Sequence, residues 1–239
     1  MVKSKSVLLL VLCLVAFAAV SCSAGQWSVR LWVQGDDGTA VGEATFSGFH
    51  PDGTETYYFD AVDFGDFGRV EDLWLELDAD PAVALHFSYI SGVSPVQSFS
   101  GHAEMDIIPT LVVTSAVASG GVTLTEGETM MPNATVTGNY GGKVWRATYN
   151  STVNYADLVT GWSLVNDTET HSEIANNPIL VPVTKIAIDY DFSLTDGDAA
   201  SGTGRFRIDG SPVPEPSGIV AIVGGGLGML GFALRKRRS

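Results

Sequence analysis

The sequence predicts an all-β protein, an antiparallel β-sandwich of jelly-roll type. Three observations carry this prediction. Apolar and polar residues alternate with a period of two in many short segments, turn-forming residues separate those segments, and no stretch in the middle of the chain sustains a period of 3.6. Nearly ten strands of this kind, each with one buried and one wet face, favour two packed antiparallel sheets.

The clearest strands are predicted over residues 82–89 and 185–194. In the second of these, Ile186, Ile188 and Tyr190 alternate with small and acidic residues. Shorter patterns predict further strands at 27–33, 44–49, 55–59, 70–77, 111–117, 134–140, 143–149 and 203–208. Residues 155–162 suit a short helix. They suit a strand equally well, because the β-branched residues there favour extended backbone.

Turn signals rich in Gly, Pro and Asp lie between the predicted strands, at 35–38, 51–53, 120–121, 138–142 and 196–198. The chain has no clean internal repeat. We therefore expect one exported domain over 25–209. A signal peptide is expected at 1–24, a linker at 210–217, a membrane-spanning helix at 218–234 and a basic tail at 235–239.

The expected domain is strongly acidic. Between positions 25 and 214 it has seven basic residues against 26 acids, which leaves a formal charge of −19. Such a surface repels phosphate backbones and anionic lipid, so nucleic acid is excluded as a partner. Both cysteines, Cys13 and Cys22, precede the domain, so no disulfide or thiol chemistry is expected within it.

The N-terminus has the features of a secretory signal. Lys3 and Lys5 precede an apolar run at 7–20, and small residues at 21–25 follow it. We expect signal peptidase to cleave after Ala24. Cys22 also leaves open a lipoprotein-type modification, although Ala19 stands where such sites usually have Leu.

The C-terminus combines three features. Val213, Pro214, Glu215 and Pro216 form an extended acidic motif, and an uncharged Gly-rich run at 218–234 follows. A helix of this length is roughly 25 Å long, just enough to cross a thin bilayer core. The basic cluster after it faces the cytoplasm by the positive-inside rule, and consists of Arg235, Lys236, Arg237 and Arg238.

This tail resembles the PEP-CTERM sorting signal of Gram-negative bacteria, through the Pro214-Glu215-Pro216 motif, the Gly-rich run and the basic cluster. The resemblance covers about 27 of the 239 residues. It implies processing by exosortase, a membrane enzyme, and an association with exopolysaccharide and biofilm matrix. The protein is then expected to be transiently anchored in the inner membrane and finally periplasmic, at the outer surface or extracellular.

No catalytic constellation is evident. The four histidines, His50, His86, His102 and His171, show no metal-site spacing. His86 is predicted on the polar face of its strand. His102 is predicted in a loop, where a ligand set with Glu104 and Asp106 is only weakly favoured.

The many carboxylates allow two further hypotheses, a glycoside hydrolase site and a structural calcium site. Close pairs such as Asp189 with Asp191 leave a glycoside hydrolase as the least favoured function, because 26 acids form close pairs by chance. No catalytic residue is therefore assigned and no cofactor is expected. Structural calcium has weak candidates in Asp196 and Asp198.

Exposed aromatic rings are a further possible signal, because rings often line sugar-binding faces. Trp32 falls opposite the apolar residues of its strand and is the main candidate, whereas Trp145, Tyr149 and Trp162 are ambiguous. The sequence leaves two functions open. One is a non-enzymatic envelope or matrix protein of unknown activity, and the other is a carbohydrate-binding module for exopolysaccharide.

Overall fold

The computed structural model describes residues 25–35, 38–49, 53–78, 80–93, 96–127, 133–165 and 167–213, and nearly all of these residues lie in β-strands. The described part contains no α-helix, and its single short helix is the 3₁₀ turn η1 (Gly65–Phe67). Every strand pairing with a stated register is antiparallel, for example β1 with β2 and β5 with β6. The prediction of an all-β antiparallel fold is confirmed.

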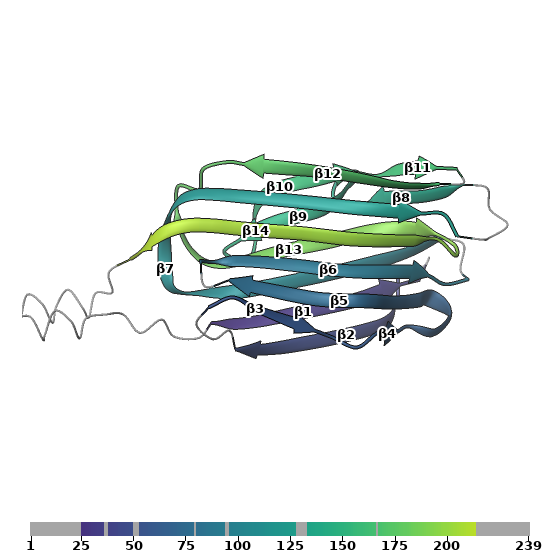
Figure 1. Ribbon diagram of the computed structural model, residues 1–239, viewed down its shortest axis with the longest axis horizontal. Coiled ribbons are helices and arrows are strands. Elements are labelled where there is room, and N and C mark those ends of the chain that lie inside the picture. Colours follow the sequence, from purple (N-terminus) through teal and green to yellow (C-terminus); the bar gives the residue numbers. More distant parts are fainter. Residues whose placement is uncertain are drawn as a thin grey trace, which may run out of the picture. The chain divides into compact units, whose positions relative to one another are not determined.

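The strand pairings divide into two sheets, which Figure 1 shows as a front and a back layer. Sheet I has the order β2, β1, β7, β13, β9, β10, with β8 beside the far end of β13 and β11 beside β8. The strands of sheet I are β1 (Gln26–Gln34), β2 (Ala40–Phe49), the first half of β7 (Val96–Thr125), β8 (Ala134–Gly138), β9 (Lys143–Tyr149), β10 (Val153–Thr160), β11 (Trp162–Leu164) and β13 (Pro182–Thr195).

Sheet II has the order β12, β7, β14, β6, β5, β3, and the short β4 also pairs with β5. Its strands are β3 (Glu55–Tyr58), β4 (Val62–Asp63), β5 (Gly68–Asp78), β6 (Ala82–Ser91), the second half of β7, β12 (Thr168–Asn176) and β14 (Ala199–Pro212).

The long strand β7 belongs to both sheets. Residues 98–105 pair with β1 in sheet I, and residues 117–125 pair with β12 in sheet II. Pairing with β13 is interrupted between Asp106 and Leu111, where β7 bends from one layer to the other (Figure 1). The two sheets are therefore joined covalently at one end of the molecule.

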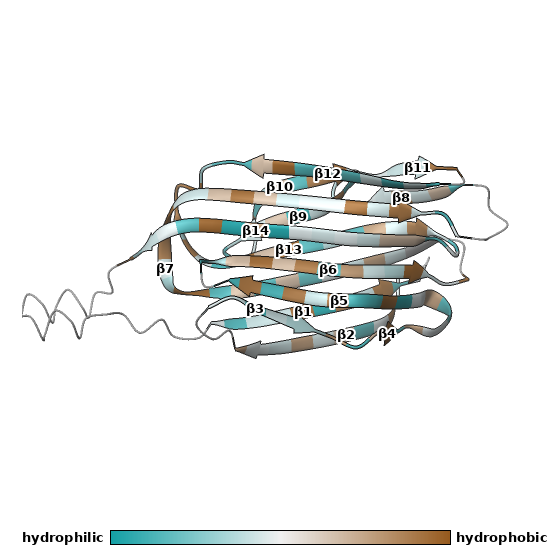
Figure 2. Ribbon diagram, in the orientation of Figure 1, coloured by the Kyte–Doolittle hydropathy of each residue, from teal (hydrophilic) through white to brown (hydrophobic). Residues whose placement is uncertain are grey.

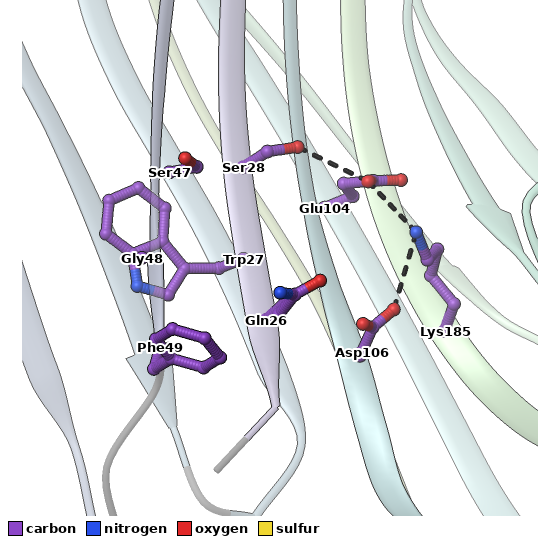
Figure 3. Close-up of a pocket in the computed structure, with 9 residues that line it drawn as sticks. All are labelled: Gln26, Trp27, Ser28, Ser47, Gly48, Phe49, Glu104, Asp106 and Lys185. Carbon is purple, nitrogen blue, oxygen red and sulfur yellow. Dashed lines mark hydrogen bonds and ion pairs between the residues drawn. The ribbon is translucent and has the colours of Figure 1, made fainter.

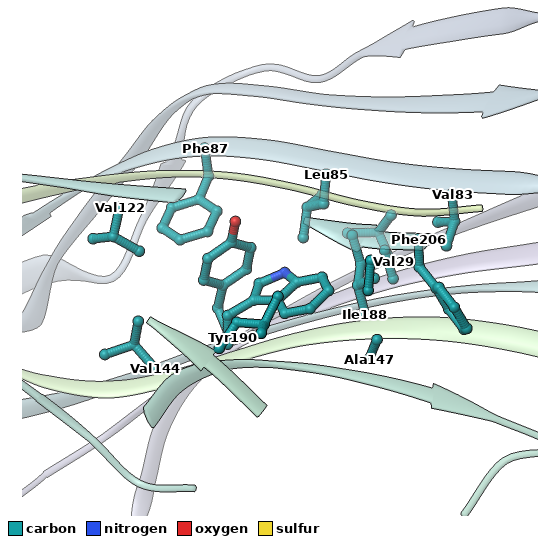
Figure 4. Close-up of a cluster of buried hydrophobic side chains, with 14 of the residues drawn as sticks. Val29, Val83, Leu85, Phe87, Val122, Val144, Ala147, Ile188, Tyr190 and Phe206 are labelled. Carbon is teal, nitrogen blue, oxygen red and sulfur yellow. The ribbon is translucent and has the colours of Figure 1, made fainter. Parts of the chain in front are cut away.

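The core lies between the two sheets and combines many Val, Leu and Ile side chains with a cluster of aromatic rings. Phe87 of β6 contacts Phe99 of β7 and Tyr190 of β13, with ring centroids 4.8 Å apart in both pairs. Figure 4 shows Phe87 and Leu85 facing Tyr190 and Ile188 across the sandwich. All of these side chains are fully buried. Burial of each large apolar side chain stabilises the fold by roughly 1.5–3 kcal/mol, so facing residues of this kind hold the layers together.

The outer faces of the sheets are polar. Brown and teal or pale residues alternate along β5 in Figure 2, as the period-two pattern predicts. On sheet I, Ser28, Glu104 and Lys185 lie on one outer surface (Figure 3). A ligand can therefore reach the sandwich only at these outer faces or at its ends.

Several predictions are corrected. His102 lies in β7, and not in a loop, because small residues such as Ser100 and Gly101 disguise the alternation of that strand. The alternative at 155–162 is resolved as strand, within β10 and the start of β11. Strand β14 continues to Pro212, through the first three residues of the expected linker, because Gly210 packs against the backbone of Val112.

The expected signal peptide, Cys22, Pro214, Glu215, Pro216, the run at 218–234 and the cluster from Arg235 to Arg238 lie outside the described residues. Val213 follows directly after β14 and is partly buried. Among the residues that the structure does describe, no helix is both long enough and apolar enough to cross a membrane.

Candidate functional site

A row of three rings crosses the outer face of sheet II near its β3 edge. Tyr58 of β3 lies opposite Trp74 of β5, which in turn lies opposite His86 of β6. Residues directly opposite each other in a sheet share a face, so the three side chains are neighbours. Tyr58 is 79% exposed, and Trp74 and His86 are partly exposed. We call Tyr58, Trp74 and His86 the ring row.

The local sequence explains why Trp74 faces outward. Leu73 and Leu75 flank it and are buried, so the indole lies on the opposite face. Val70 is also buried, three positions before Leu73, which breaks the period of two. A β-bulge between Glu71 and Trp74 accommodates the extra residue.

The bulge also positions a carboxylate. Asp72 within it has a φ of 50°, a left-handed conformation that Asp tolerates better than most residues. The backbone N–H of Phe59 donates a hydrogen bond of 3.0 Å to the carbonyl of Leu73, which joins the bulge to the chain after β3. Asp72 is exposed and lies beside the ring row.

The imidazole of His86 supports the Trp74 indole. The two rings are stacked, with centroids 5.2 Å apart and planes inclined by 16°. His86 Nδ1 lies 2.7 Å from Thr203 Oγ1 of β14, which fixes the imidazole from its other side. Burial lowers the pKa of His86 and outweighs the opposing effect of the Asp72 charge. The imidazole is therefore mainly neutral at pH 7.

An open depression of about 690 Å³ surrounds the ring row. Its lining residues are Tyr58, Phe59, Asp60, Ala61, Glu71, Asp72, Leu73, Trp74 and His86. Three of these are acids, and Arg69 forms an ion pair of 2.9 Å with Glu71. The depression thus combines flat apolar ring faces with carboxylate acceptors at its rim.

The outer face of sheet I carries a second, smaller cavity of about 290 Å³ (Figure 3). Its lining consists of Gln26, Trp27, Ser28, Ser47, Gly48, Phe49, Glu104, Asp106 and Lys185. Lys185 Nζ lies 2.9 Å from Glu104 and 3.4 Å from Asp106, and the Ser28 hydroxyl donates a hydrogen bond to Glu104. The charged groups of this cavity therefore bind one another.

Beside that cavity, His102 is held by two carboxylates. Its Nδ1 lies 2.6 Å from Asp189 Oδ1, and its Nε2 lies 3.5 Å from Glu104 Oε2. Burial acts to lower the pKa of His102, but hydrogen bonds to Asp189 and Glu104 prevail and raise the pKa to about 9. The hydrogen bond from His102, together with Lys185, lowers the pKa of Glu104 to about 2.

Two aromatic rings on the side of sheet I are covered by guanidinium groups. The Arg30 guanidinium carbon lies 4.8 Å from the centre of the Trp32 ring, and that of Arg146 lies 4.1 Å from the Tyr140 ring. Trp32 is only partly exposed. This candidate ring is therefore less accessible than Tyr58, and Trp145, the ambiguous ring in β9, is fully buried in the core.

The metal-ligand candidates from the sequence have other partners. His102, Glu104 and Asp106 do lie on one face of β7, but Lys185 and Asp189 bind them. The described residues contain no group of three or more side chains suited to hold a metal ion.

The weak calcium candidates Asp196 and Asp198 lie in and beside a turn, and Asp198 is occupied by other groups. Asp198 is 1% exposed, accepts a hydrogen bond of 2.9 Å from the Gly127 N–H and is bonded by the Thr195 hydroxyl. Asp196 is partly buried in the adjoining turn. In the structure, Asp198 therefore ties two loops together.

Sequence reasoning did not identify Tyr58, Trp74 or Asp72. A signal for Trp74 was available, because it alternates with Leu73, Leu75 and Leu77 and so must face outward. The pair Tyr57-Tyr58 also requires one ring to be exposed in a half-buried strand. The convergence of three strands on one row is visible only in the structure.

No family model matches the chain, and no curated protein does. Among solved structures, one chain described as "CBM4 structure and function" is similar at 13% sequence identity, with a TM-score of 0.19 over 67% of this chain and 86% of that chain. A TM-score this low does not establish a shared fold.

Proposed function

We propose that this protein is an exported, non-catalytic envelope or matrix protein that binds carbohydrate through the ring row on sheet II. The carrying observation is the open stack of Trp74 on His86 beside the exposed Tyr58. Flat aromatic faces suit the apolar C–H faces of sugar rings, and a few polar groups around them fix orientation.

The rim of the depression indicates which sugars fit best. Asp60, Glu71 and Asp72 present carboxylates that accept hydrogen bonds from sugar hydroxyl or amino groups. All seven Lys and Arg side chains in the described residues have a carboxylate within 4.0 Å. Neutral or amino-sugar polymers are therefore favoured over uronic-acid polymers, which the surplus acids repel.

Binding is favoured over hydrolysis because the depression is open. A glycosidase needs a carboxylic acid whose pKa is raised by an enclosed, apolar site. Asp60 and Asp72 are instead exposed at the surface. An open surface of this kind can bind along a polysaccharide chain, but it does not enclose a glycosidic bond.

The proposed delivery of the protein rests on its sequence. The signal-like N-terminus supports export, and the PEP-like motif with its apolar run and basic cluster supports sorting by an exosortase-type enzyme. Alanines at Pro214, Glu215 and Pro216 should change both the localisation and the apparent mass. Unchanged behaviour would mean that the tail is only an anchor.

The finer topology is proposed to be jelly-roll-like. Successive strands cross between the layers at β6 to β7, β12 to β13 and β13 to β14. Such crossings are typical of jelly rolls, whereas meandering sandwiches keep neighbouring strands in one sheet.

Binding of soluble polysaccharides by the full chain in mild detergent tests the proposal. The panel holds a neutral glucan, a partly deacetylated amino-sugar polymer and a uronic-acid polymer. Trp74→Ala and Tyr58→Ala should each weaken binding at least tenfold. Trp32→Ala is the matched control, because Arg30 already covers that ring. Wild-type affinity in Trp74→Ala, with circular dichroism unchanged, would refute the ring row as the site.

A further inference from the structure

Exposed apolar side chains gather at the end of the sandwich where β7 bends. Leu180 is 90% exposed, Val112 51%, Val181 45% and Ile108 44%. Val181 directly precedes Pro182, which pairs with Val112 across β13 and β7. We call Ile108, Val112, Leu180 and Val181 the apolar end patch.

The last strand ends beside this patch. The Thr114 hydroxyl donates a hydrogen bond of 3.1 Å to the Asp209 carbonyl, and a Cβ on Gly210 would lie 2.5 Å from the Val112 carbonyl oxygen. Figure 1 shows β14 ending at the same side of the molecule as the bend in β7. The chain therefore leaves the sandwich next to the apolar end patch.

Only five residues, 213–217, separate the end of β14 from the uncharged run at 218–234. Two of the five are Pro214 and Pro216, which favour extended backbone. A chain of five residues spans at most about 18 Å in any conformation. The inference rests on the proposed anchoring of the protein by the 218–234 run, because a domain joined to that anchor by five residues keeps this end within reach of the lipid surface.

We propose that the apolar end patch contacts the outer leaflet of the bilayer that the 218–234 run crosses, so that the anchored protein stands with this end against the lipid. Exposed Leu and Val side chains gain by entering the interfacial region of a bilayer. The domain's acidic surface repels anionic headgroups, so the contact is apolar and suits a zwitterionic surface. This contact is independent of the ring row.

The test uses site-specific fluorescence in the full chain. The only cysteines, Cys13 and Cys22, precede the domain, so replacing both with Ser allows single probes to be introduced elsewhere. Leu180→Cys carries a polarity-sensitive fluorophore in the patch. Val93→Cys is the matched control, because Val93 is 76% exposed and follows β6, whose end at Ile90 pairs with Ala199 at the start of β14.

Both labelled chains are reconstituted into phosphatidylcholine vesicles and isolated by flotation. The Leu180 probe should shift to shorter wavelength and be quenched at least twofold more by brominated lipid than the Val93 probe. Equal responses of the two probes in floating vesicles would overturn the contact. A chain that does not float with the vesicles would also overturn the proposal, because the proposal requires the tail to span the membrane.

Discussion

Trp74 and His86 are stacked across neighbouring strands of sheet II, with ring centroids 5.2 Å apart and Thr203 bonded to the far side of the imidazole. The imidazole therefore positions the indole, although Tyr58, on the other side of Trp74, is the more exposed neighbour. This relationship predicts that the binding face of Trp74 depends on a residue that need not touch the ligand.

His86→Ala should weaken glycan binding about three- to tenfold, because the indole loses the support that orients it. The affinity is measured on the same polysaccharide panel, with circular dichroism as the check on folding. Thr203→Val should have a smaller effect in the same direction, since it removes only the hydrogen bond to the imidazole. Undiminished affinity in His86→Ala would show that the stack is not needed for binding.

The left-handed conformation of Asp72 predicts a graded response to substitution. Asp72→Gly should change the free energy of unfolding by less than about 0.5 kcal/mol, because Gly adopts a φ of 50° without strain. Asp72→Val should cost about 1–2 kcal/mol, because a β-branched residue is strained in this region. Urea denaturation measures both. Equal stability of the two variants would contradict the bulge geometry.

Much of the fold could be predicted from the sequence where a strand has one buried face. The alternation at 185–194 gave β13, and that at 82–89 gave β6. Strand β12 was not predicted, because it is an edge strand without a fully buried side chain and so lacks an apolar period. The crossing of β7 between the sheets depends on pairing partners distant in sequence, which alternation does not reveal.

The candidate site was harder to predict for a similar reason. The polar faces of His86 and Trp32 are correctly read from alternation, but alternation does not show what covers a side chain. Arg30 lies two positions before Trp32 and stacks on it, whereas Tyr58 stays open. Accessibility was therefore decided by neighbours, and not by the strand pattern.

His102 predicts a pH dependence of stability. Its pKa is about 9 in the folded protein and about 6.5 when unfolded, so folding favours its protonated form. This stabilisation is fully present below pH 6.5 and is lost as the pH rises through 9. The shift corresponds to roughly 3 kcal/mol at most.

His102→Gln should accordingly lower the free energy of unfolding by about 1–3 kcal/mol at pH 6 and by much less at pH 10. The groups that face His102 are Asp189 and Glu104, with Lys185 bonded to Glu104. Urea denaturation at the two pH values gives the difference. An equal decrease in the free energy of unfolding at both pH values would show that packing, and not the charge of His102, causes the effect.

The packing of Trp145 gives the sharpest stability prediction. Gly204 lies so close to this buried indole that an added Cβ would be 2.1 Å from Trp145 Nε1 and 2.8 Å from the Tyr190 hydroxyl oxygen. Both side chains are fully buried, so any movement away from the new methyl group must displace neighbouring core atoms. Gly204→Ala should therefore destabilise the protein by about 1–3 kcal/mol through overpacking.

Gly121→Ala is the matched control, because its added Cβ would meet nothing closer than 3.6 Å. This variant should keep wild-type stability within about 0.5 kcal/mol or gain slightly from reduced freedom in the unfolded chain. Thermal and urea unfolding of the two variants measure the contrast. Equal stability would mean that Trp145 moves aside readily, and the two layers would then be packed less tightly around it than the structure shows.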